Sequence, residues 1–467
     1  MGSIATELRR KSVHMSMGLF ALLLRWLSPF EAAACAAVAL LFNLFVLHRL
    51  TRRSLLRDDE RARGYSTGIV LYPAAVLTLI LVFHHRFELA AACWALMAFG
   101  DGMATVTGVS LRGPKLPWNE RKTWWGFCAF ALYGTCTSAL LIRWVQHGDV
   151  ESGAIGSSFL GQPTSSPVSD TAFLLLGCLA ASVVAGFAES LETGVDDNLL
   201  VPLTGGGALY AATLVEPVRL AAAGGALGHD LAVGAAVNVL LAAAAYAARG
   251  VDVSGAAGGW VLGTLLYGFG GWRGFLMLLG FFAVATAATQ VGYARKAALG
   301  IAQERGGRRG ARHALANAGA GVLFAFLAAA TPYHAAFTLA SVAAFATALA
   351  DTASSEVGQA FGRRHFLVTT FRRVPAGTEG AVSVEGTLAG VLASIALASA
   401  AWGVGLVGAS GVAVVTAAAF VGTTLESYLG AIPRRAGPID NEFLNFANTL
   451  AGGLAAIGIF FFVGVLG

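Results

Sequence analysis

The sequence predicts an all-α membrane protein, a polytopic bundle of about 15 transmembrane helices in two related halves. The chain has 467 residues, of which 56% are hydrophobic and only 12% are charged, about half of the charged fraction usual in soluble domains. Apolar runs of about 17 to 25 residues recur along its whole length, and each is long enough to cross a bilayer. A soluble protein of this composition would expose a large apolar surface. Soluble enzymes are therefore excluded, and no nucleic-acid partner is expected.

The apolar runs fall into two groups along the chain. Seven predicted spans make the first half, residues 1–216, at about 15–28, 31–48, 66–84, 89–108, 124–144, 171–191 and 200–216. A junction rich in Gly and Ala follows at about 217–230. Eight spans make the second half, residues 231–467, at about 231–249, 254–271, 274–293, 314–331, 335–350, 387–405, 409–429 and 443–465. The many Ala and Gly residues suit close helix packing in lipid.

The distribution of basic residues predicts a cytoplasmic N-terminus. In that orientation, four loops with several Lys or Arg residues face the cytoplasm, at about 49–65, 111–123, 295–312 and 351–385. The longest loop on the opposite side, at about 145–170, contains no Lys or Arg, as the positive-inside rule requires. Every polar motif described below then lies at the cytoplasmic face, where nucleotides are found. We expect a multi-pass protein of a bacterial inner membrane.

The first half carries an aspartate between two glycines at the end of an apolar run, in Phe99-Gly-Asp-Gly102. A carboxylate at a membrane edge is costly unless it has a function, and Asp101 is a candidate Mg²⁺ ligand. A basic loop follows, and Lys122 and Thr123 then begin the next helix, where free N–H groups favour anions. Lys122 could alternatively extend from the membrane edge into water.

Two further polar stretches flank this motif. Glu7, Arg10 or Lys11, and His14 share one helix face by their spacing, although a charge anchor that orients the first helix also explains the basic residues. Near the end of the sixth span, four carboxylates lie within nine residues, at Glu189, Glu192, Asp196 and Asp197. They indicate metal ligands or a base that accepts a hydroxyl proton; the alternative is a solvated loop.

The second half repeats the same order of motifs. The stretch Asp351 to Gly358 matches Asp101 to Gly108 as Asp-x6-Gly. The segment 374–387, with a proline and then polar donors and glycines, corresponds to the Pro117–Gly126 loop. Glu426-Ser427 followed by Asp440-Asn441 corresponds to Glu189-Ser190 followed by Asp197-Asn198. Three motifs in the same order and on the same predicted side indicate an old duplication.

Some polar residues occur only in the second half. Basic residues at Lys296 and Arg309 could hold phosphate, and Asn441, Asn445 and Asn448 share one helix face by their spacing. Asparagines within spans, such as Asn317 and Asn445, are expensive unless they bind a partner or ligand, and hydrogen bonds between helices would explain them equally well. The glycine-rich segment Gly268–Gly274 follows a span rather than a strand, so we expect a tight turn rather than a nucleotide loop.

These motifs resemble known families. The first half, about residues 1–215, resembles the CTP-dependent polyprenol kinases, the dolichol and phytol kinase group, in Glu7-Leu-x-Arg-Lys-x-x-His14, Phe99-Gly-Asp-Gly102, Pro117-Trp-Asn-x-x-Lys-Thr-x-x-Gly126 and Asp196-Asp-Asn-Leu-x-x-Pro202. The second half, about residues 230–467, resembles the membrane family that includes phytyl-phosphate kinase and animal transmembrane protein 19. Its marks are Ala350-Asp-Thr-x-x-Ser-Glu-x-Gly358, Val374-Pro-x-Gly-Thr-x-Gly-Ala-Val-Ser383 and Leu429-Gly-Ala431. It departs from that pattern at Glu426, where Asp is expected, and at His313, where Gln is expected.

The resemblance implies a bifunctional kinase that converts a prenyl alcohol, of the phytol or geranylgeraniol type, to its monophosphate and then to its diphosphate. CTP would be the phosphoryl donor in the first step, and CTP or another nucleoside triphosphate in the second. The prenyl chain would lie between helices in the bilayer. Phosphoryl transfer depends mainly on positioning and charge neutralisation, so the polar residues receive the following roles.

In the first half, Mg²⁺ is assigned to Asp101, Glu189, Asp196 and Asp197, phosphate to Arg10 or Lys11, Lys122 and Thr123, and the hydroxyl proton to His14 or a carboxylate. The remaining nucleotide contacts are assigned to Gly102, Asn119, Gly126 and Asn198. In the second half, metal is assigned to Asp351, Glu356 and Glu426. Phosphate and nucleotide contacts are assigned there to Lys296, Arg309, Asn317, Arg373, Gly377, Thr378, Gly380, Ser383, Asn441 and Asn445.

Two other functions remain open at this point. A CTP-dependent lipid cytidylyltransferase would share CTP, Mg²⁺ and the membrane, but the Gly-Gly-x-x-Asp-Arg signature of that family is missing. A transporter-like protein would also have two related halves. Inverted repeats would place matching motifs on opposite sides of the membrane, whereas these motifs lie on the same predicted side. Both points favour the kinase.

Overall fold

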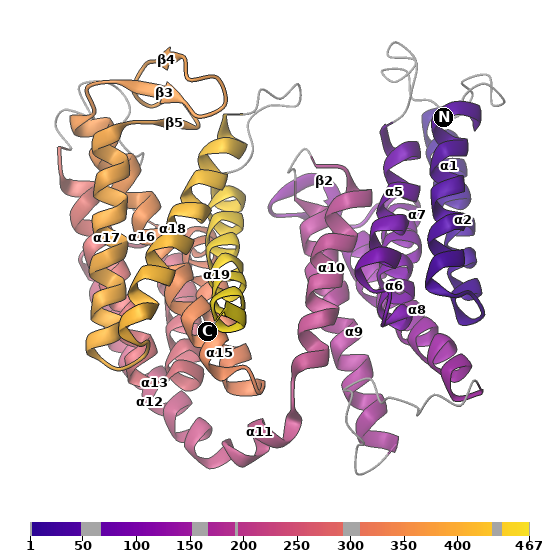
Figure 1. Cartoon of the computed structure of the whole chain (residues 1–467), viewed down its shortest axis with the longest axis horizontal. Helices are drawn as coiled ribbons and strands as arrows, with labels where there is room; N and C mark the ends of the chain where they lie inside the picture. The colour runs from indigo at the N-terminus through magenta and orange to yellow at the C-terminus, as the bar shows by residue number, and fades with distance from the viewer. Residues whose placement is uncertain are drawn as a thin grey trace. The chain divides into compact units, whose positions relative to one another are not determined.

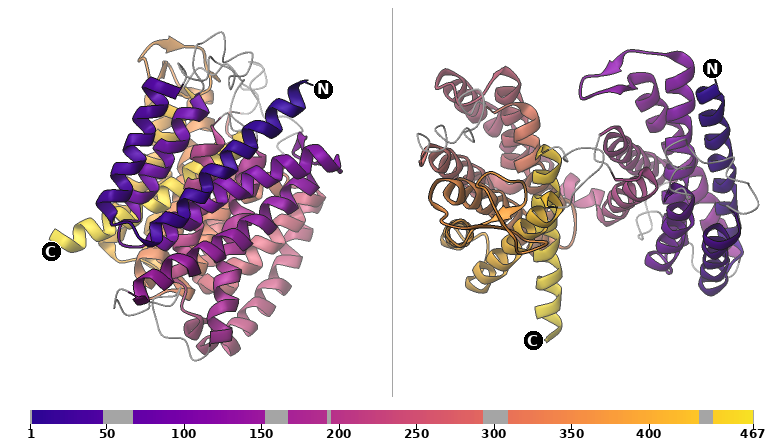
Figure 2. Two further views of the ribbon diagram at one scale, coloured as in Figure 1. Left: turned by 90° about the vertical axis from the view of Figure 1, so that its right-hand side faces the viewer. Right: turned by 90° about the horizontal axis from the view of Figure 1, so that it is seen from above.

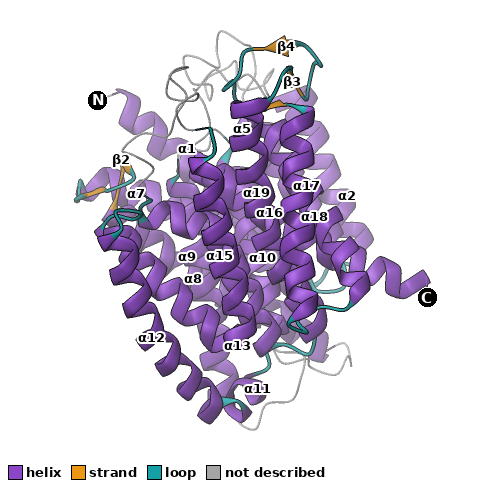
Figure 3. Ribbon diagram, turned by 90° about the vertical axis from the view of Figure 1, so that its left-hand side faces the viewer, coloured by secondary structure: helices purple, strands orange, loops and turns teal. Residues whose placement is uncertain are grey.

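The computed structural model describes residues 2–47, 67–151, 167–191, 195–292, 309–431 and 441–466. The described chain is almost entirely helical, with a few short strands at the ends of helices (Figures 1 and 3). The chain divides into two compact units, Met1–Val215 and Glu216–Gly467. The protein is therefore an all-α polytopic membrane bundle, as its composition predicts.

Among the described residues, the first unit has seven helical segments and one hairpin. Its helical elements are α1 (Gly2–Gly18) with η1 (Leu19–Arg25), α2 (Pro29–Phe42) with η2 (Asn43–Leu47), α5 (Thr67–Val82), α6 (Phe87–Ala95) with η3 (Leu96–Gly100) and α7 (Asp101–Leu111), α8 (Trp124–Glu151), α9 (Pro167–Ser190) and α10 (Asp197–Leu214). Between α7 and α8 lie the antiparallel strands β1 (Lys115–Leu116) and β2 (Asn119–Thr123).

The second unit has a comparable sequence of elements. Its helices are α11 (Pro217–Ala222), α12 (Gly224–Ala247), α13 (Val253–Gln290), α15 (Ala311–Ala330), α16 (His334–Phe361), α17 (Val384–Gly403), α18 (Ala409–Gly430) and α19 (Asn441–Leu466). Between α16 and α17 lies a three-stranded sheet in the order β4-β3-β5, formed by β3 (His365–Leu367), β4 (Arg373–Val374) and β5 (Ala381–Val382). Figure 2 shows this sheet at one end of the helices of its unit.

The predicted spans correspond to helices of the structure. Eleven helices of the described chain are long and apolar enough to cross a membrane, and Gly68–Val82 is a shorter apolar helix. All fifteen predicted spans lie on helical segments, although two of them, 254–271 and 274–293, are the two arms of α13. The break between the arms is at Gly271, with φ 63° and ψ −174°, a conformation that glycine adopts most easily. The expected tight turn is therefore a kink inside one long helical element.

The structure also describes the junction and one loop expected from the sequence. The junction at 217–230 is mostly helical, since it contains α11 and the start of α12. The loop expected at 351–385 begins later, because α16 continues to Phe361 and keeps Asp351 inside a helix. The change from apolar to polar residues therefore does not mark the helix end here.

Each unit has its own core, and one helix lies at its centre. In the first unit, α6 contributes a continuous buried run from Leu89 to Cys93, which packs against α8 and α10. In the second unit, α16 packs against α13, α15, α17, α18 and α19. Both central helices continue into the Asp-x6-Gly motif, so the polar motifs are held by the most buried helices of each unit.

Candidate functional site

A turn of π-helix brings Asp101 and the first helix together. The backbone N–H of Asp101 donates to Leu96 O, five residues back, so it does not use the carbonyl of Met97. That carbonyl accepts a hydrogen bond from His14 Nε2 on α1 at 2.8 Å. The same contact places Lys11 Nζ 2.5 Å from Asp101 Oδ2. π-Helical turns are frequent at functional sites, and this one positions α1 on the aspartate.

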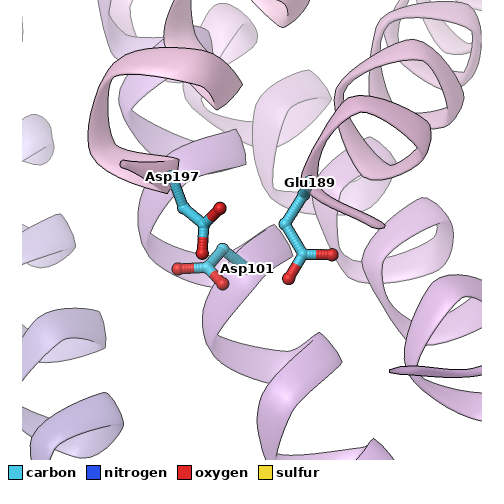
Figure 4. A group of neighbouring side chains, drawn as sticks. All are labelled: Asp101, Glu189 and Asp197. Atoms are coloured by element: carbon cyan, nitrogen blue, oxygen red, sulfur yellow. The ribbon is translucent and has the colours of Figure 1, made fainter. Parts of the chain in front are cut away.

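Three carboxylates converge at this point (Figure 4). Asp101, Glu189 at the end of α9 and Asp197 at the start of α10 each offer one oxygen, and these oxygens lie within 4.8 Å of one another. We call these three side chains the carboxylate cluster. Asp101 and Glu189 are 2% and 6% exposed, and Asp101 Oδ1 has no hydrogen-bond partner among the described residues. A buried carboxylate oxygen without a partner is costly, and it suits a cation ligand.

Lys122 completes the cluster from the hairpin. Its ammonium group pairs with Glu189. Burial alone would lower the pKa of Lys122, but Glu189 and Asp197 outweigh that effect and raise it. Burial and the neighbouring charge of Asp101 raise the pKa of Asp197 to about 7. The structure therefore brings together predicted site residues from α1, α7, β2, α9 and α10.

The hairpin is fastened to the end of α9, beside Glu189. Asn119 Nδ2 donates to Ser190 O at 2.9 Å, and Trp118 Nε1 donates to Ser190 Oγ at 2.9 Å. Asn119 Oδ1 accepts the backbone N–H of Arg121. Asn119, expected to contact nucleotide, thus uses its side chain to position Lys122. Neither Trp118 nor Ser190 had been assigned a role from the sequence, although the recurrence of the Glu-Ser pair was a usable signal.

Four other predicted site residues have local roles in the first unit. Asp196 is the N-cap of α10, where its Oδ1 accepts the backbone N–H of Asn198 at 3.0 Å and the amide of Asn198 at 2.8 Å. It lies outside the carboxylate cluster, and its side chain caps α10. Gly102 allows α1 to approach α7, because a Cβ there would collide with Met15. Arg10 is half-buried on α1, and its side chain is not without an interaction partner.

Thr123 and Gly126 form a tight helix crossing rather than an open anion site. Thr123 Oγ1 is buried and accepts the backbone N–H of Gly126 at 3.2 Å. A Cβ on Gly126 would lie 2.9 Å from Ala104 O and 3.6 Å from the Cα of Gly108. The start of α8 therefore rests directly on the backbone of α7, and this contact holds Lys122 next to Asp101.

The second unit contains the same crossing. Ser383 Oγ accepts the backbone N–H of Gly386 at 3.1 Å, and Ser383 is the buried N-cap of α17. A Cβ on Gly386 would lie 2.5 Å from Ser354 O and 3.1 Å from the Cα of Gly358. The two glycines, the hydroxyl and the carbonyl thus occupy the same places, relative to the Asp-x6-Gly motif, in both units. This agreement supports the duplication inferred from the sequence.

The acidic groups of the second unit differ in their partners. The carboxyl groups of Asp351 on α16 and Glu426 on α18 lie close to each other, and neither forms an ion pair with a lysine or arginine among the described residues. Glu356 is buried one turn beyond Asp351, and the charge of Arg309 acts on it. Val382 stands directly before Ser383, where Lys122 stands before Thr123. The second unit therefore lacks the hairpin lysine of the first.

The other residues predicted in the second unit are spread over the fold. Arg309 Nη2 donates to Thr289 Oγ1 at 3.3 Å, and Asn317 Nδ2 donates to His313 O at 2.9 Å. Arg373 is exposed, and its guanidinium group lies over the ring of Phe366. Thr378 Oγ1 donates a hydrogen bond to Pro375 O, and Gly377 and Gly380 have positive φ angles. On α19, Asn441 is exposed at the first residue and Asn445 is half-buried. Lys296 and Asp440 lie outside the described residues. Asn448 is 1% exposed, and neither atom of its amide has a hydrogen-bond partner among the described residues.

Comparison with known proteins identifies the family. A family model described as integral membrane protein DUF92 matches residues 236–462. The Uncharacterized membrane protein sll0875 of Synechocystis sp. is 46% identical over 203 residues, which are 43% of this chain and 79% of that relative. The chain belongs to the DUF92 family of integral membrane proteins.

Two other relatives of this DUF92 protein are chloroplastic plant proteins, and the name of one of them states a function. Protein VTE6, chloroplastic, of Arabidopsis thaliana is 40% identical over 215 residues, 44% of this chain and 65% of that protein. Probable phytol kinase 3, chloroplastic, of Glycine max is 32% identical over 212 residues, 42% of this chain and 60% of that protein. The matches to these two relatives thus cover less than two thirds of each. No solved structure matches the chain.

Proposed function

We propose that this protein is an integral-membrane prenyl alcohol kinase. It would transfer a phosphoryl group from CTP to an alcohol of the phytol or geranylgeraniol type in the first unit, and a second phosphoryl group to the resulting monophosphate in the second unit. The observation that carries the proposal is the carboxylate cluster with its two paired lysines, in a chain whose relatives include one named as a probable phytol kinase.

The first unit holds the groups that phosphoryl transfer requires. Asp101 and Glu189 would hold Mg²⁺, with Asp197 as the third carboxylate, and the unpartnered Oδ1 of Asp101 fits that ligand. When bound, the metal neutralises charge on the transferred phosphoryl group. Lys11 and Lys122 would hold phosphate oxygens.

The hydroxyl proton needs an acceptor. No lysine is hydrogen-bonded to Asp197 among the described residues, so Asp197 is the carboxylate best suited to receive it. His14 is less suited through Nε2, because that atom donates to Met97 O. Only Nδ1 of His14 would be free for this role.

The second unit would use the same frame for a different acceptor. Asp351 and Glu426 would hold metal there, and the helix that carries Asp351 crosses α17 at Gly358 and Gly386. A prenyl monophosphate is already anionic, so this site would need additional cationic side chains to bind it. Arg309 and Lys296 are the candidates for this role. The basic loops support an orientation with both sites at the cytoplasmic face.

The proposal can be tested with purified protein in detergent. The assay supplies CTP, Mg²⁺ and phytol or geranylgeraniol, and it separates the alcohol, the monophosphate and the diphosphate. Three variants are compared with wild type: Asp101→Asn, Asp351→Asn and, as a matched control outside both sites, Asp230→Asn on α12. We expect diphosphate from wild type and from the control, no product from Asp101→Asn, and accumulated monophosphate from Asp351→Asn.

Product analysis separates the proposal from its alternatives. Release of CDP identifies a kinase, whereas release of pyrophosphate with CTP and an acidic lipid would identify a cytidylyltransferase and overturn the proposal. Monophosphate as the only product of wild type would restrict the kinase activity to the first step. Failure to phosphorylate any prenyl alcohol, while CTP still binds, would leave the first unit a nucleotide-binding membrane protein without this activity.

A further inference from the structure

Each lysine of the first site forms an ion pair with a carboxylate that a divalent cation would need as a ligand. Lys11 pairs with Asp101 and Lys122 with Glu189. The lysine side chains are 14% and 36% exposed, whereas the carboxylates they hold are 2% and 6% exposed. The ammonium groups can therefore turn toward water by rotation of their flexible side chains, while the two carboxylates are held inside the protein.

The charge of the cluster does not favour a free divalent cation. Three carboxylates and two ammonium groups leave a single net negative charge even when all are ionised. A divalent cation added alone would make this buried group net positive, and it would lie close to both ammonium groups. Like charges at such distances in a partly buried site repel strongly. A nucleoside triphosphate brings several negative charges, so it removes this obstacle and offers the lysines new partners.

The second unit shows what happens where the hairpin lysine is missing. Val382 takes the place of Lys122, and among the described residues no lysine or arginine forms an ion pair with Asp351 or Glu426. The paired lysines of the first unit are therefore a specific difference between two otherwise similar sites.

We propose that Lys11 and Lys122 are exchangeable counterions that exclude free Mg²⁺ from the first site and admit it only together with a nucleoside triphosphate. In the ligand-free state they hold Asp101 and Glu189. When the nucleotide arrives with its cation, the carboxylates pass to the metal and the lysines pass to the phosphate oxygens. The inference rests on the proposed function for the identity of the nucleotide site, but it concerns binding and not turnover.

Binding of Mn²⁺ without nucleotide tests the first part. The full chain in detergent is titrated with Mn²⁺ and followed by electron paramagnetic resonance, with Asp351→Ala present throughout to remove the second site. We expect Lys122→Met and Lys11→Met to bind Mn²⁺ about tenfold or more tightly than the parent, since each removes a positive charge beside the metal. Lys115→Met, on the same hairpin but exposed, is the matched control and should leave Mn²⁺ affinity unchanged.

Nucleotide binding tests the second part. With saturating Mg²⁺, affinity for a non-hydrolysable CTP analogue should fall about tenfold or more in Lys122→Met and Lys11→Met, and stay unchanged in Lys115→Met. A lysine with a purely structural role would weaken both metal and nucleotide binding, and that result overturns the inference. Thermal unfolding accompanies each variant, and Lys122→Gln replaces Lys122→Met if the latter does not fold.

The outcomes for the two proposals are distinguishable. Unchanged or weaker Mn²⁺ binding in the lysine variants, or a parent that binds Mn²⁺ equally tightly with and without nucleotide, refutes the exchange even if prenyl alcohols are phosphorylated. Opposite changes in Mn²⁺ and nucleotide affinity support the exchange even if no alcohol is phosphorylated, and in that case only the proposed function fails.

Discussion

Replacing Gly126 by alanine should open the crossing of α7 and α8. A Cβ on Gly126 would lie 2.9 Å from Ala104 O, whereas ordinary contacts begin at 3.4 Å, so the helices must separate by about 0.5 Å. Overpacking of this kind costs about 1–3 kcal/mol. For a unit of this size, the loss corresponds to a fall in the unfolding temperature of roughly 2–12 °C.

The assay compares unfolding temperatures in detergent for three variants. Gly207→Ala, exposed on α10 with no atom within 4 Å of the new Cβ, is the control for the gain of up to about 1 kcal/mol that alanine brings to a helix. Gly386→Ala, whose Cβ would lie 2.5 Å from Ser354 O, should lose at least as much stability as Gly126→Ala. The displacement should also lower phosphorylation in Gly126→Ala about tenfold, because Lys122 stands at this crossing.

The reasoning is refuted if Gly126→Ala and Gly386→Ala unfold at the temperature of Gly207→Ala. That result would mean that the backbones are not in contact at the crossing. A loss of stability in Gly386→Ala alone would restrict the tight crossing to the second unit and would remove the structural argument for the duplication.

Three further predictions concern the first site. Asn119→Ala should destabilise the hairpin by about 1–3 kcal/mol, since it leaves buried groups unpaired, and should raise the KM for nucleotide; an unchanged KM would show that Asn119 does not position Lys122. Asp196→Ala should lower the free energy of unfolding by about 1 kcal/mol, because the N-cap of α10 is lost, and should leave the metal affinity unchanged. Weaker metal binding in this variant would show that Asp196 is a metal ligand. The pKa of Asp197 is raised to about 7, so the folded protein holds this proton at pH values where the unfolded chain has lost it. Mg²⁺ must displace the proton of Asp197 to bind there. Mg²⁺ affinity, measured with bound nucleotide, should therefore rise about tenfold per pH unit up to about pH 7 and then level off. An affinity that does not change with pH, or the same pH profile in Asp197→Asn, would contradict this prediction.

The local features of the chain were predictable because they depend on residues close together in sequence. Apolar length and periodicity identified the helices, and all fifteen predicted spans lie on helical segments. The recurrence of Asp-x6-Gly and of the Glu-Ser pair indicated two related units, since a repeated motif needs no knowledge of packing. Even the convergence of Asp101, Glu189 and Asp197 was partly expected, because all were assigned to one site.

The tertiary structure decided which neighbours share a site. Asp196 and Asp197 are adjacent, yet only Asp197 joins the carboxylate cluster, because the first residue caps α10 and the second begins it. Pairing of Lys11 with Asp101 depends on a π-helical turn that frees the Met97 carbonyl for His14. These contacts join residues about 80–90 positions apart in the sequence, so only the packing of whole helices determines them.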